Sequence, residues 1–328
     1  MSEPNPFDAL LAQAQALVDA GQAQDALPLF DQALALQPDS AYGWFCRGCA
    51  CSILEQPAEA ARCYLESTRR KADHPVTWFN LGNALQALGK VQEALDCFDL
   101  VLQLAPEEAD AWINKGRLLD DRGDHAEALA CYDEALRLAP DDEIAWGNRG
   151  NSLRGLGRLP EALASYERAL KLNPTSLAGL FGSGDCLLRL DRLDEARTFI
   201  ERGLVHHARF AAGWCDLGLI FSRQKQYEKA LKAFNHAAEL APEAPEVWNN
   251  LGEALGALHH YEQALAPFER ALELAPDFAA SWFGKARALA NLGRHADALA
   301  AAQTFLAMAP ADDPLRDPAQ SIVARCSR

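Results

Sequence analysis

The chain has 328 residues, of which 49% are hydrophobic, and its formal net charge is −15 at pH 7. This acidic balance argues against a general nucleic-acid surface, because the phosphate backbone needs clustered Lys and Arg side chains. The apolar runs are shorter than the roughly 18 residues of a membrane-spanning helix. The nine cysteines form no secreted disulfide framework, and the N-terminus lacks the features of a signal peptide. We therefore expect a cytoplasmic chain that binds neither nucleic acid nor membrane.

A fixed period of 34 residues organises the sequence from residue 7 to residue 312. Each period contains two amphipathic helical patterns that meet near a turn residue such as Gly89, and a residue such as Pro106 ends the second pattern. A polar lead-in occupies residues 1–6, and the apolar side chains within residues 313–328 predict a short capping helix. The nine contiguous units are 7–40, 41–74, 75–108, 109–142, 143–176, 177–210, 211–244, 245–278 and 279–312.

Equivalent positions of the units share size and chemistry. All seven tryptophans fall in one column: Trp44, Trp78, Trp112, Trp146, Trp214, Trp248 and Trp282. Four positions later, seven units carry a glycine: Gly48, Gly82, Gly116, Gly150, Gly184, Gly218 and Gly252. Residues four apart share a helix face, so we expect each tryptophan to be core and to fill the space beside its glycine. The paired helices would then approach closely.

The pattern Trp-x2-Leu-Gly-x2-Leu, followed by Gly, Ala-x3-Phe and Pro between Trp78 and Pro106, resembles the tetratricopeptide repeat. The resemblance covers about nine tenths of the chain. It implies an all-α fold, a right-handed superhelical solenoid of antiparallel helix pairs. The first helix of each pair would line a concave groove, and the second would form the convex surface. Stacked neighbours would complete the core that one hairpin leaves exposed.

The sixth unit departs from the pattern at four columns. Leu180 replaces tryptophan, Ile200 replaces the aromatic residue, Gly203 replaces alanine and Ala208 replaces proline. Because these changes remove side-chain volume and a helix stop, we expect weaker packing in this unit. Its local stability should then be the lowest in the chain.

A polar column two residues after the tryptophans gives the strongest functional signal. Its members are Asn80, Asn114, Asn148, Asp216 and Asn250. Asparagine is a poor helix-interior residue because its amide competes for backbone hydrogen bonds, so its repetition calls for a cause. The column would face the groove, where an amide can both donate to and accept from a peptide backbone. It resembles the asparagine ladder in the repeat region of O-linked N-acetylglucosamine transferases. In the alternative interpretation, the amides bond neighbouring helices or water.

A second groove set comprises Asn83, Arg117, Asn151, Arg154, Arg189 and Arg223. Its four arginines predict a basic stripe, and guanidinium groups pair well with carboxylates. Acidic residues on the same helices also allow a mixed, solvated surface. Asn83 and Asn114 resemble part of the Lys/Asn clamp by which chaperone-binding tetratricopeptide domains hold a C-terminal carboxylate. However, Phe79 stands where that clamp has its first lysine.

The sequence contains no recognisable catalytic or metal-binding constellation. Cys46, Cys49 and Cys51 cannot converge on one ion, because Cys51 lies about 140° from Cys46 around a helix. Three further cysteines share one helix column, where a thiol packs as a small apolar group. No phosphate-binding loop, nucleophile elbow or catalytic carboxylate pair occurs in the sequence. We predict a non-catalytic protein without metal or cofactor.

Together these observations predict an adaptor or scaffold that binds an extended peptide or protein segment in its concave groove. Two alternatives remain open. One is a chaperone cofactor that recognises acidic C-termini. The other is a self-assembling scaffold whose groove accepts the terminus of a neighbouring copy, and self-association would distinguish it.

Overall fold

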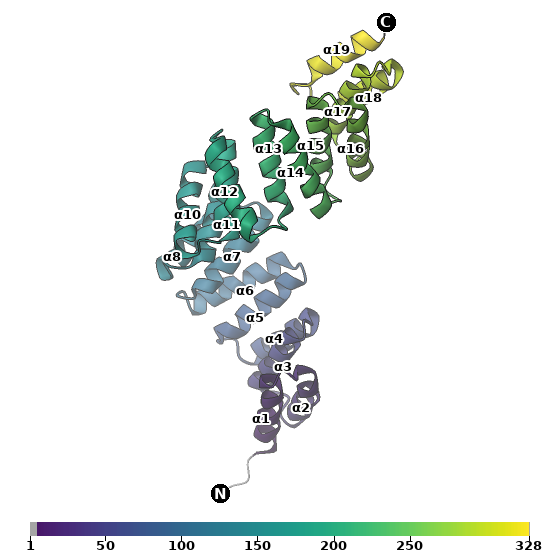
Figure 1. Cartoon of the computed structure of the whole chain (residues 1–328). Coiled ribbons are helices and arrows are strands. Elements are labelled where there is room, and N and C mark those ends of the chain that lie inside the picture. The colour runs from purple at the N-terminus through teal and green to yellow at the C-terminus, as the bar shows by residue number, and fades with distance from the viewer. Residues whose placement is uncertain (1–4, 328) are drawn as a thin grey trace. The chain divides into compact units, whose positions relative to one another are not determined.

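The computed structural model describes residues 5–327, which form nineteen α-helices and no β-strand (Figure 1). The helices are α1 (Pro6–Asp19), α2 (Ala23–Leu36), α3 (Ala41–Ile53), α4 (Pro57–Arg70), α5 (Pro75–Ala87), α6 (Val91–Leu104), α7 (Ala109–Arg122), α8 (His125–Leu138), α9 (Glu143–Gly155), α10 (Leu159–Leu172), α11 (Leu177–Arg189), α12 (Leu193–His206), α13 (Ala211–Arg223), α14 (Tyr227–Leu240), α15 (Pro245–Ala257), α16 (Tyr261–Leu274), α17 (Ala279–Asn291), α18 (His295–Met308) and α19 (Arg316–Cys326). The all-α class and the consecutive helix pairs of a solenoid are confirmed.

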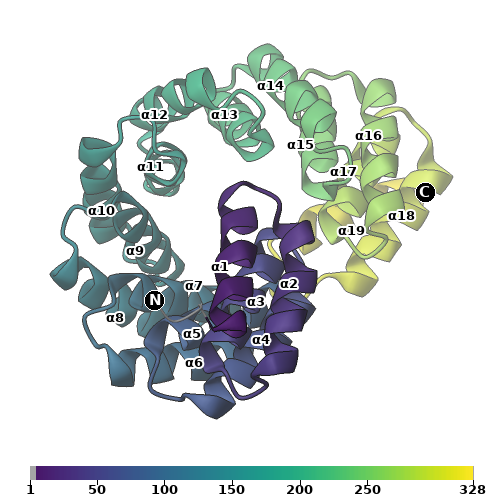
Figure 2. The ribbon, with the colours of Figure 1, turned by 90° about the horizontal axis from the view of Figure 1, so that it is seen from below.

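Two compact units make up the chain, and they divide between Arg158 and Leu159. Within each unit, the second helix of a pair contacts the first helix of the next pair, as α4 contacts α5 and α12 contacts α13. In the second unit, the first helices α11, α13 and α15 lie on the inner side and their partners on the outer side (Figure 2). The last helix, α19, packs on α18 and buries Ala319 and Ile322. Within residues 5–327, no helix is long and apolar enough to cross a membrane.

The turn inside each pair has one recurring backbone form. Its turn residue has a positive φ in all nine repeats, and it is glycine in five of them: Gly21, Gly89, Gly123, Gly157 and Gly293. The four other residues are Glu55, Asp191, Lys225 and His259. An L side chain in this left-handed conformation costs about 1–2 kcal/mol, which glycine avoids. The turn closes through backbone bonds such as Lys90 N to Leu85 O at 2.9 Å.

Six of the column glycines, namely Gly48, Gly82, Gly116, Gly184, Gly218 and Gly252, pack against a large side chain of the partner helix. A Cβ atom on Gly82 would lie 3.0 Å from the ring of Phe98, and one on Gly116 would lie 2.8 Å from the ring of Tyr132. Both rings are fully buried. The expectation that tryptophan fills this space was therefore wrong. The tryptophan stands one turn away on the same helix, whereas the ring comes from the facing helix.

The seven tryptophans are half-buried, and they join consecutive repeats. Each indole Nε1 donates to the carbonyl oxygen six residues earlier, at 2.7–3.1 Å. The accepting residues are Pro38, Ala72, Pro106, Pro140, Ala208, Pro242 and Pro276. Because each acceptor lies in the turn that ends the preceding repeat, the indole ties that turn to the next helix. The bond persists where alanine replaces proline.

The sixth repeat is repacked rather than loosened. Leu180 and Ile200, at the tryptophan and aromatic columns, are fully buried. The ring of Phe181 occupies the space that two glycines leave, since Cβ atoms on Gly203 and Gly213 would lie 2.7 and 2.3 Å from it. The expectation of weaker packing was therefore wrong, because a neighbouring column supplies the missing volume. The order in which the repeats open stays a prediction.

Candidate functional site

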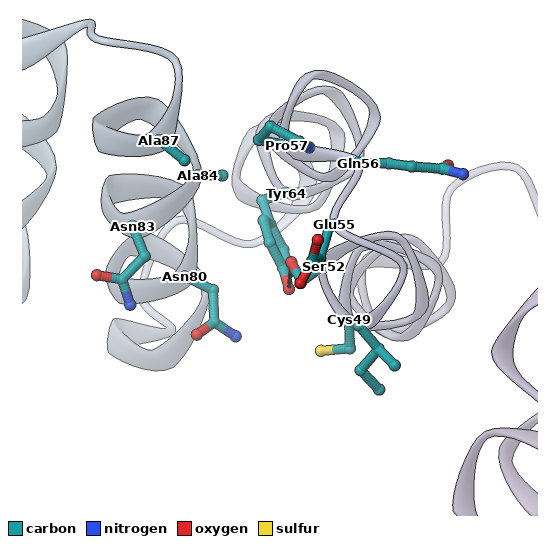
Figure 3. Close-up of a pocket in the computed structure, with 11 residues that line it drawn as sticks. Cys49, Ser52, Glu55, Gln56, Pro57, Tyr64, Asn80, Asn83, Ala84 and Ala87 are labelled. Carbon is teal, nitrogen blue, oxygen red and sulfur yellow. Dashed lines mark hydrogen bonds between the residues drawn. The ribbon is translucent and has the colours of Figure 1, made fainter. Parts of the chain in front are cut away.

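A cleft of about 550 Å³ lies between α3, α4 and α5 of the first unit (Figure 3). Its apolar wall includes Ile53, Pro57 and Ala87. The amides of Asn80 and Asn83 project from one face of α5, across from α3. The cleft therefore combines apolar surface with two groups that can each donate and accept hydrogen bonds.

The floor of the cleft is hydrogen-bonded and uncharged. The ring of Tyr64 is buried, and its hydroxyl is 3.0 Å from Ser52 Oγ, with which it shares a hydrogen bond. Burial raises the pKa of the Tyr64 phenol and that of the Cys49 thiol, so both stay protonated near neutral pH. Glu55 supplies a carboxylate at the rim. Within residues 5–327, Glu55 forms no ion pair.

The predicted amide column divides into bonded and unbonded members in the first unit. Asn114 Nδ2 donates to Asn83 Oδ1 at 3.1 Å, which ties α7 to α5. This bond leaves the amide nitrogen of Asn83 unused. Among the described residues, neither Asn80 nor Asn148 has a side-chain hydrogen bond. Asn80 is thus the column member that faces the cleft with its full bonding capacity.

In the second unit, the column serves the packing between helices. Asn250 Nδ2 donates to Cys215 Sγ at 3.4 Å. The neighbouring Asn249 is buried and accepts from Ser281 Oγ at 3.0 Å. Asp216 lies half-buried on α13. The amide ladder does not continue here as a row of free groups.

The predicted arginine set is engaged largely within the chain. Arg117 Nη2 donates to Gln86 Oε1 at 2.8 Å. Arg189 forms an ion pair with Asp185 at 3.1 Å. Arg223 Nη1 donates to Leu188 O at 2.9 Å and lies 3.6 Å from an Asp191 carboxylate oxygen. Asn151 and Arg154 are half-buried on α9.

A set of exposed apolar residues accompanies the amide column, and these residues were not among the predicted site residues. Tyr42, Val76 and Ile144 are 63%, 48% and 61% exposed, and in their own repeats they stand four residues before the amide column. Residues four apart share a helix face, so these side chains flank the groove positions. The sequence does contain a pattern that could have identified them, because apolar residues recur at this column, and the structure shows that the column is exposed.

A second hollow of about 190 Å³ lies at the other end of α5. Val76 and Phe79 supply its apolar wall, and Glu108 and Asp110 line its edge. Both carboxylates are exposed, and within the described residues neither forms an ion pair. Each end of α5 thus carries apolar surface beside carboxylates that have no counter-ion.

The corresponding cleft of the second unit has a different charge arrangement. It measures about 420 Å³, and its lining includes Tyr227, Tyr261, Glu253 and Arg287. Arg287 Nη2 and Glu253 Oε2 form an ion pair at 2.5 Å. The carboxylate and the guanidinium therefore neutralise each other inside this cleft.

One buried thiol of the first unit has an unusual environment. Arg47 Nη1 donates to Cys63 Sγ at 3.0 Å. The Cys51 thiol also hydrogen-bonds to Cys63, and together the two bonds lower the pKa of Cys63 to about 7. Cys97 occupies the same column one repeat later, where burial raises its pKa to about 12. Among the described residues, no group of His, Cys, Asp or Glu side chains has an arrangement that holds a metal ion.

The helix pairs, the recurring turn and the glycine–aromatic packing define an α-solenoid of helical hairpins. Sequence profiles of the tetratricopeptide repeat match residues 7–48, 54–106, 79–143, 148–213, 209–277 and 250–313. The chain belongs to the tetratricopeptide repeat family. No match was found among curated proteins.

Solved structures with similar folds include the APC/C hetero-tetramer Cut9–Hcn1, with a TM-score of 0.64 and 19% identity. That match covers 86% of this chain and 55% of the other, so this chain spans about half of its length. A repeat protein from Cytophaga hutchinsonii matches with a TM-score of 0.59 and 14% identity, over 74% of this chain and 99% of that one. One from Parabacteroides merdae gives 0.58 and 14%, over 77% and 99%. At these identities the likeness shows the fold alone.

Proposed function

We propose that the chain is a non-catalytic interaction adaptor or scaffold that binds an extended peptide or protein segment across α3 and α5. The observation that carries this proposal is the cleft of the first unit, where the unbonded amide of Asn80 meets apolar surface. Membership of a family of helical-hairpin repeats supports an interaction role. The nine cysteines are free thiols, which suits our proposal of a reducing cytoplasm.

The amides suit a peptide backbone for geometric reasons. Asn80 and Asn83 stand three residues apart on α5, so their Cβ atoms lie about 5–6 Å from each other. An extended chain advances about 3.3 Å per residue, and groups two residues apart face the same side. Two amides at this separation can therefore meet neighbouring N–H and C=O groups along one edge of the segment. Such contacts depend little on the side chains of the segment.

A random dodecamer library displayed on phage tests the proposal. Wild-type protein should enrich peptides that bind it. The double variant Asn80→Ala, Asn83→Ala should bind these peptides about tenfold more weakly. Each lost hydrogen bond costs about 0.5–1.5 kcal/mol, and about 1.4 kcal/mol is a factor of ten. Asn250→Ala is the matched control, because that amide bonds Cys215 in the second unit.

Circular dichroism must show that the double variant keeps its helices, as we expect because alanine favours helix. Failure to enrich any peptide would overturn the proposal. Equal affinity of the enriched peptides for wild type and the double variant would also overturn it. Light scattering at several concentrations checks the self-assembling alternative, which predicts a mass that grows with concentration.

A further inference from the structure

We propose that the bound segment is both apolar and basic, with two aliphatic side chains in the hollows at the ends of α5 and a Lys or Arg beside each. This inference rests on the proposed function and adds the chemistry of the partner. It selects a basic ligand, whereas the arginine set of the groove had pointed to an acidic one.

The two hollows supply the apolar part of this specificity. The larger one has Ile53, Pro57 and Ala87 in its wall, and the smaller one has Val76 and Phe79. Ile53 is 58% exposed. Covering its apolar surface would stabilise a complex by about 25 cal/mol for each Å² removed from water. An aliphatic side chain of a ligand would cover these surfaces.

The carboxylates supply the basic part. Glu55 lines the larger hollow, and Glu108 and Asp110 line the smaller one. Among the described residues, none of the three carboxylates has an ion-pair partner. A Lys or Arg next to each aliphatic residue would provide the missing counter-ions.

Two nearby cations of the first unit are already paired with carboxylates, whereas Lys71, just before α5, has no ion pair among the described residues. Lys90 pairs with Glu93 at 3.0 Å, and Arg62 pairs with Glu59 at 2.5 Å. Arg117 reaches the edge of α5, where it bonds the neutral amide of Gln86. The residues of the first unit include 25 acidic and 13 basic side chains, for a net charge of −12, whereas those of the second include 21 and 18. The field around α5 therefore favours a cation.

The length of α5 predicts the spacing of the ligand residues. Val76 and Ala87 mark the two hollows and stand eleven positions apart, which is about 16 Å along a helix. An extended segment covers that distance in about five residues. Asn80 and Asn83 line the larger hollow and stand between Val76 and Ala87 on α5, where they would hold the backbone between the two aliphatic residues.

Four fluorescein-labelled dodecamers with Gly-Ser flanks test the inference by fluorescence anisotropy on the full chain. The first carries two Leu-Lys pairs five residues apart. In the other three, Ser replaces Leu, Glu replaces Lys, or both changes are made. The first peptide should bind at least tenfold more tightly than each of the others. Its affinity should fall with added salt, because salt screens exposed charges.

A charge-reversal variant sharpens the test. Glu55 has a φ of 54°, and Lys225 holds the same turn position in the seventh repeat with a φ of 58°. Glu55→Lys should therefore keep the fold, weaken the Leu-Lys peptide and strengthen the Leu-Glu peptide. The matched control is Asp191→Lys, which makes the same charge change at the equivalent turn of the second unit. It should leave the ranking of the peptides unchanged.

The outcomes separate this inference from the proposed function. If all four peptides bind alike and Asn80→Ala weakens them alike, the backbone-binding function holds and the basic-apolar specificity is wrong. Preference for the Leu-Glu peptide overturns the inference in favour of an acidic ligand. Absence of binding by the Leu-Lys peptide also overturns the inference. The phage-display experiment then tests the proposed function independently.

Discussion

The fourth and sixth repeats build the same helical hairpin from different residues. In the fourth, Gly116 of α7 lies under the ring of Tyr132 from α8. In the sixth, Gly184 of α11 lies under Ile200 of α12, and a Cβ on this glycine would be 2.3 Å from Ile200 Cδ1. Tyr132 and Ile200 are both fully buried. The smaller side chain therefore lies against its glycine as tightly as the aromatic ring does in the fourth repeat.

A second difference lies at the junction with the following repeat. After the fourth repeat, Ile113 and the alanines Ala135 and Ala145 are all buried at this junction. After the sixth, the equivalent positions are Phe181 and two glycines, and the ring fills what the glycines leave. The comparison teaches that packing volume is conserved among residues that meet in space. It is not conserved within each column of the repeat.

The largest expected effect is at Phe181. Phe181→Ala should destabilise the chain by about 3–5 kcal/mol, as truncation of a buried aromatic does. The surrounding glycines have no side chains that can collapse into the cavity. Ile113→Ala is the matched change at the fourth repeat and should cost less, because only an aliphatic side chain is lost there. Urea unfolding followed by circular dichroism measures both, and equal losses would break the comparison.

Overpacking should give a smaller loss. Gly184→Ala places a methyl group against Ile200, and such insertions cost about 1–3 kcal/mol. Adding Ile200→Val removes the methyl group that the new side chain meets, so the double variant should recover part of the loss. A double-mutant cycle of unfolding free energies measures this coupling. Zero coupling would show that the contact between Gly184 and Ile200 does not determine the effect.

The tryptophan bonds should contribute less again. Trp146 donates to Pro140 at the end of the fourth repeat, and Trp214 donates to Ala208 at the end of the sixth. Replacing either tryptophan with Phe removes the N–H donor at a cost of about 0.5–1.5 kcal/mol. We expect similar losses, because the geometry is the same with and without proline. A much smaller loss for Trp214→Phe, measured by thermal unfolding, would mean that the sixth repeat ends more loosely.

The pH dependence of the unfolding free energy tests whether two cysteines of one column, Cys63 and Cys97, differ in ionisation. Cys63 has a folded pKa of about 7 against an ordinary value of 9.0, so its ionisation stabilises the fold. That contribution is complete above about pH 9 and is lost as the pH falls through about 7. Cys97, in the same column, has a raised pKa and stays protonated across this window. Its thiol therefore contributes no such rise.

Unfolding free energies between pH 6 and 9 should show this difference. The stability of wild type relative to Cys63→Ala should rise between about pH 7 and 9. The stability of wild type relative to Cys97→Ala should show no such rise. A wild-type profile that matches the Cys63→Ala profile throughout would show that Arg47 does not hold a thiolate.

The sequence by itself determined the repeat architecture. The 34-residue period, the paired amphipathic patterns and turn residues such as Gly89 depend on local rules of helix periodicity and backbone conformation. Such rules act within one hairpin and recur in every unit, so they can be read without knowledge of distant contacts. They also identified the asparagine column, because asparagine is unfavourable inside a helix.

Only the tertiary structure decided which residues meet across the hairpins. It paired Gly82 with Phe98 rather than with Trp78, and it placed Phe181 between two glycines of neighbouring helices. It also separated Asn114, which is bonded to another amide, from Asn80, which faces a cleft. The physical reason is that these outcomes depend on the close approach of helices. A column of equivalent residues records what one position contains, but not which side chain from the facing helix lies against it.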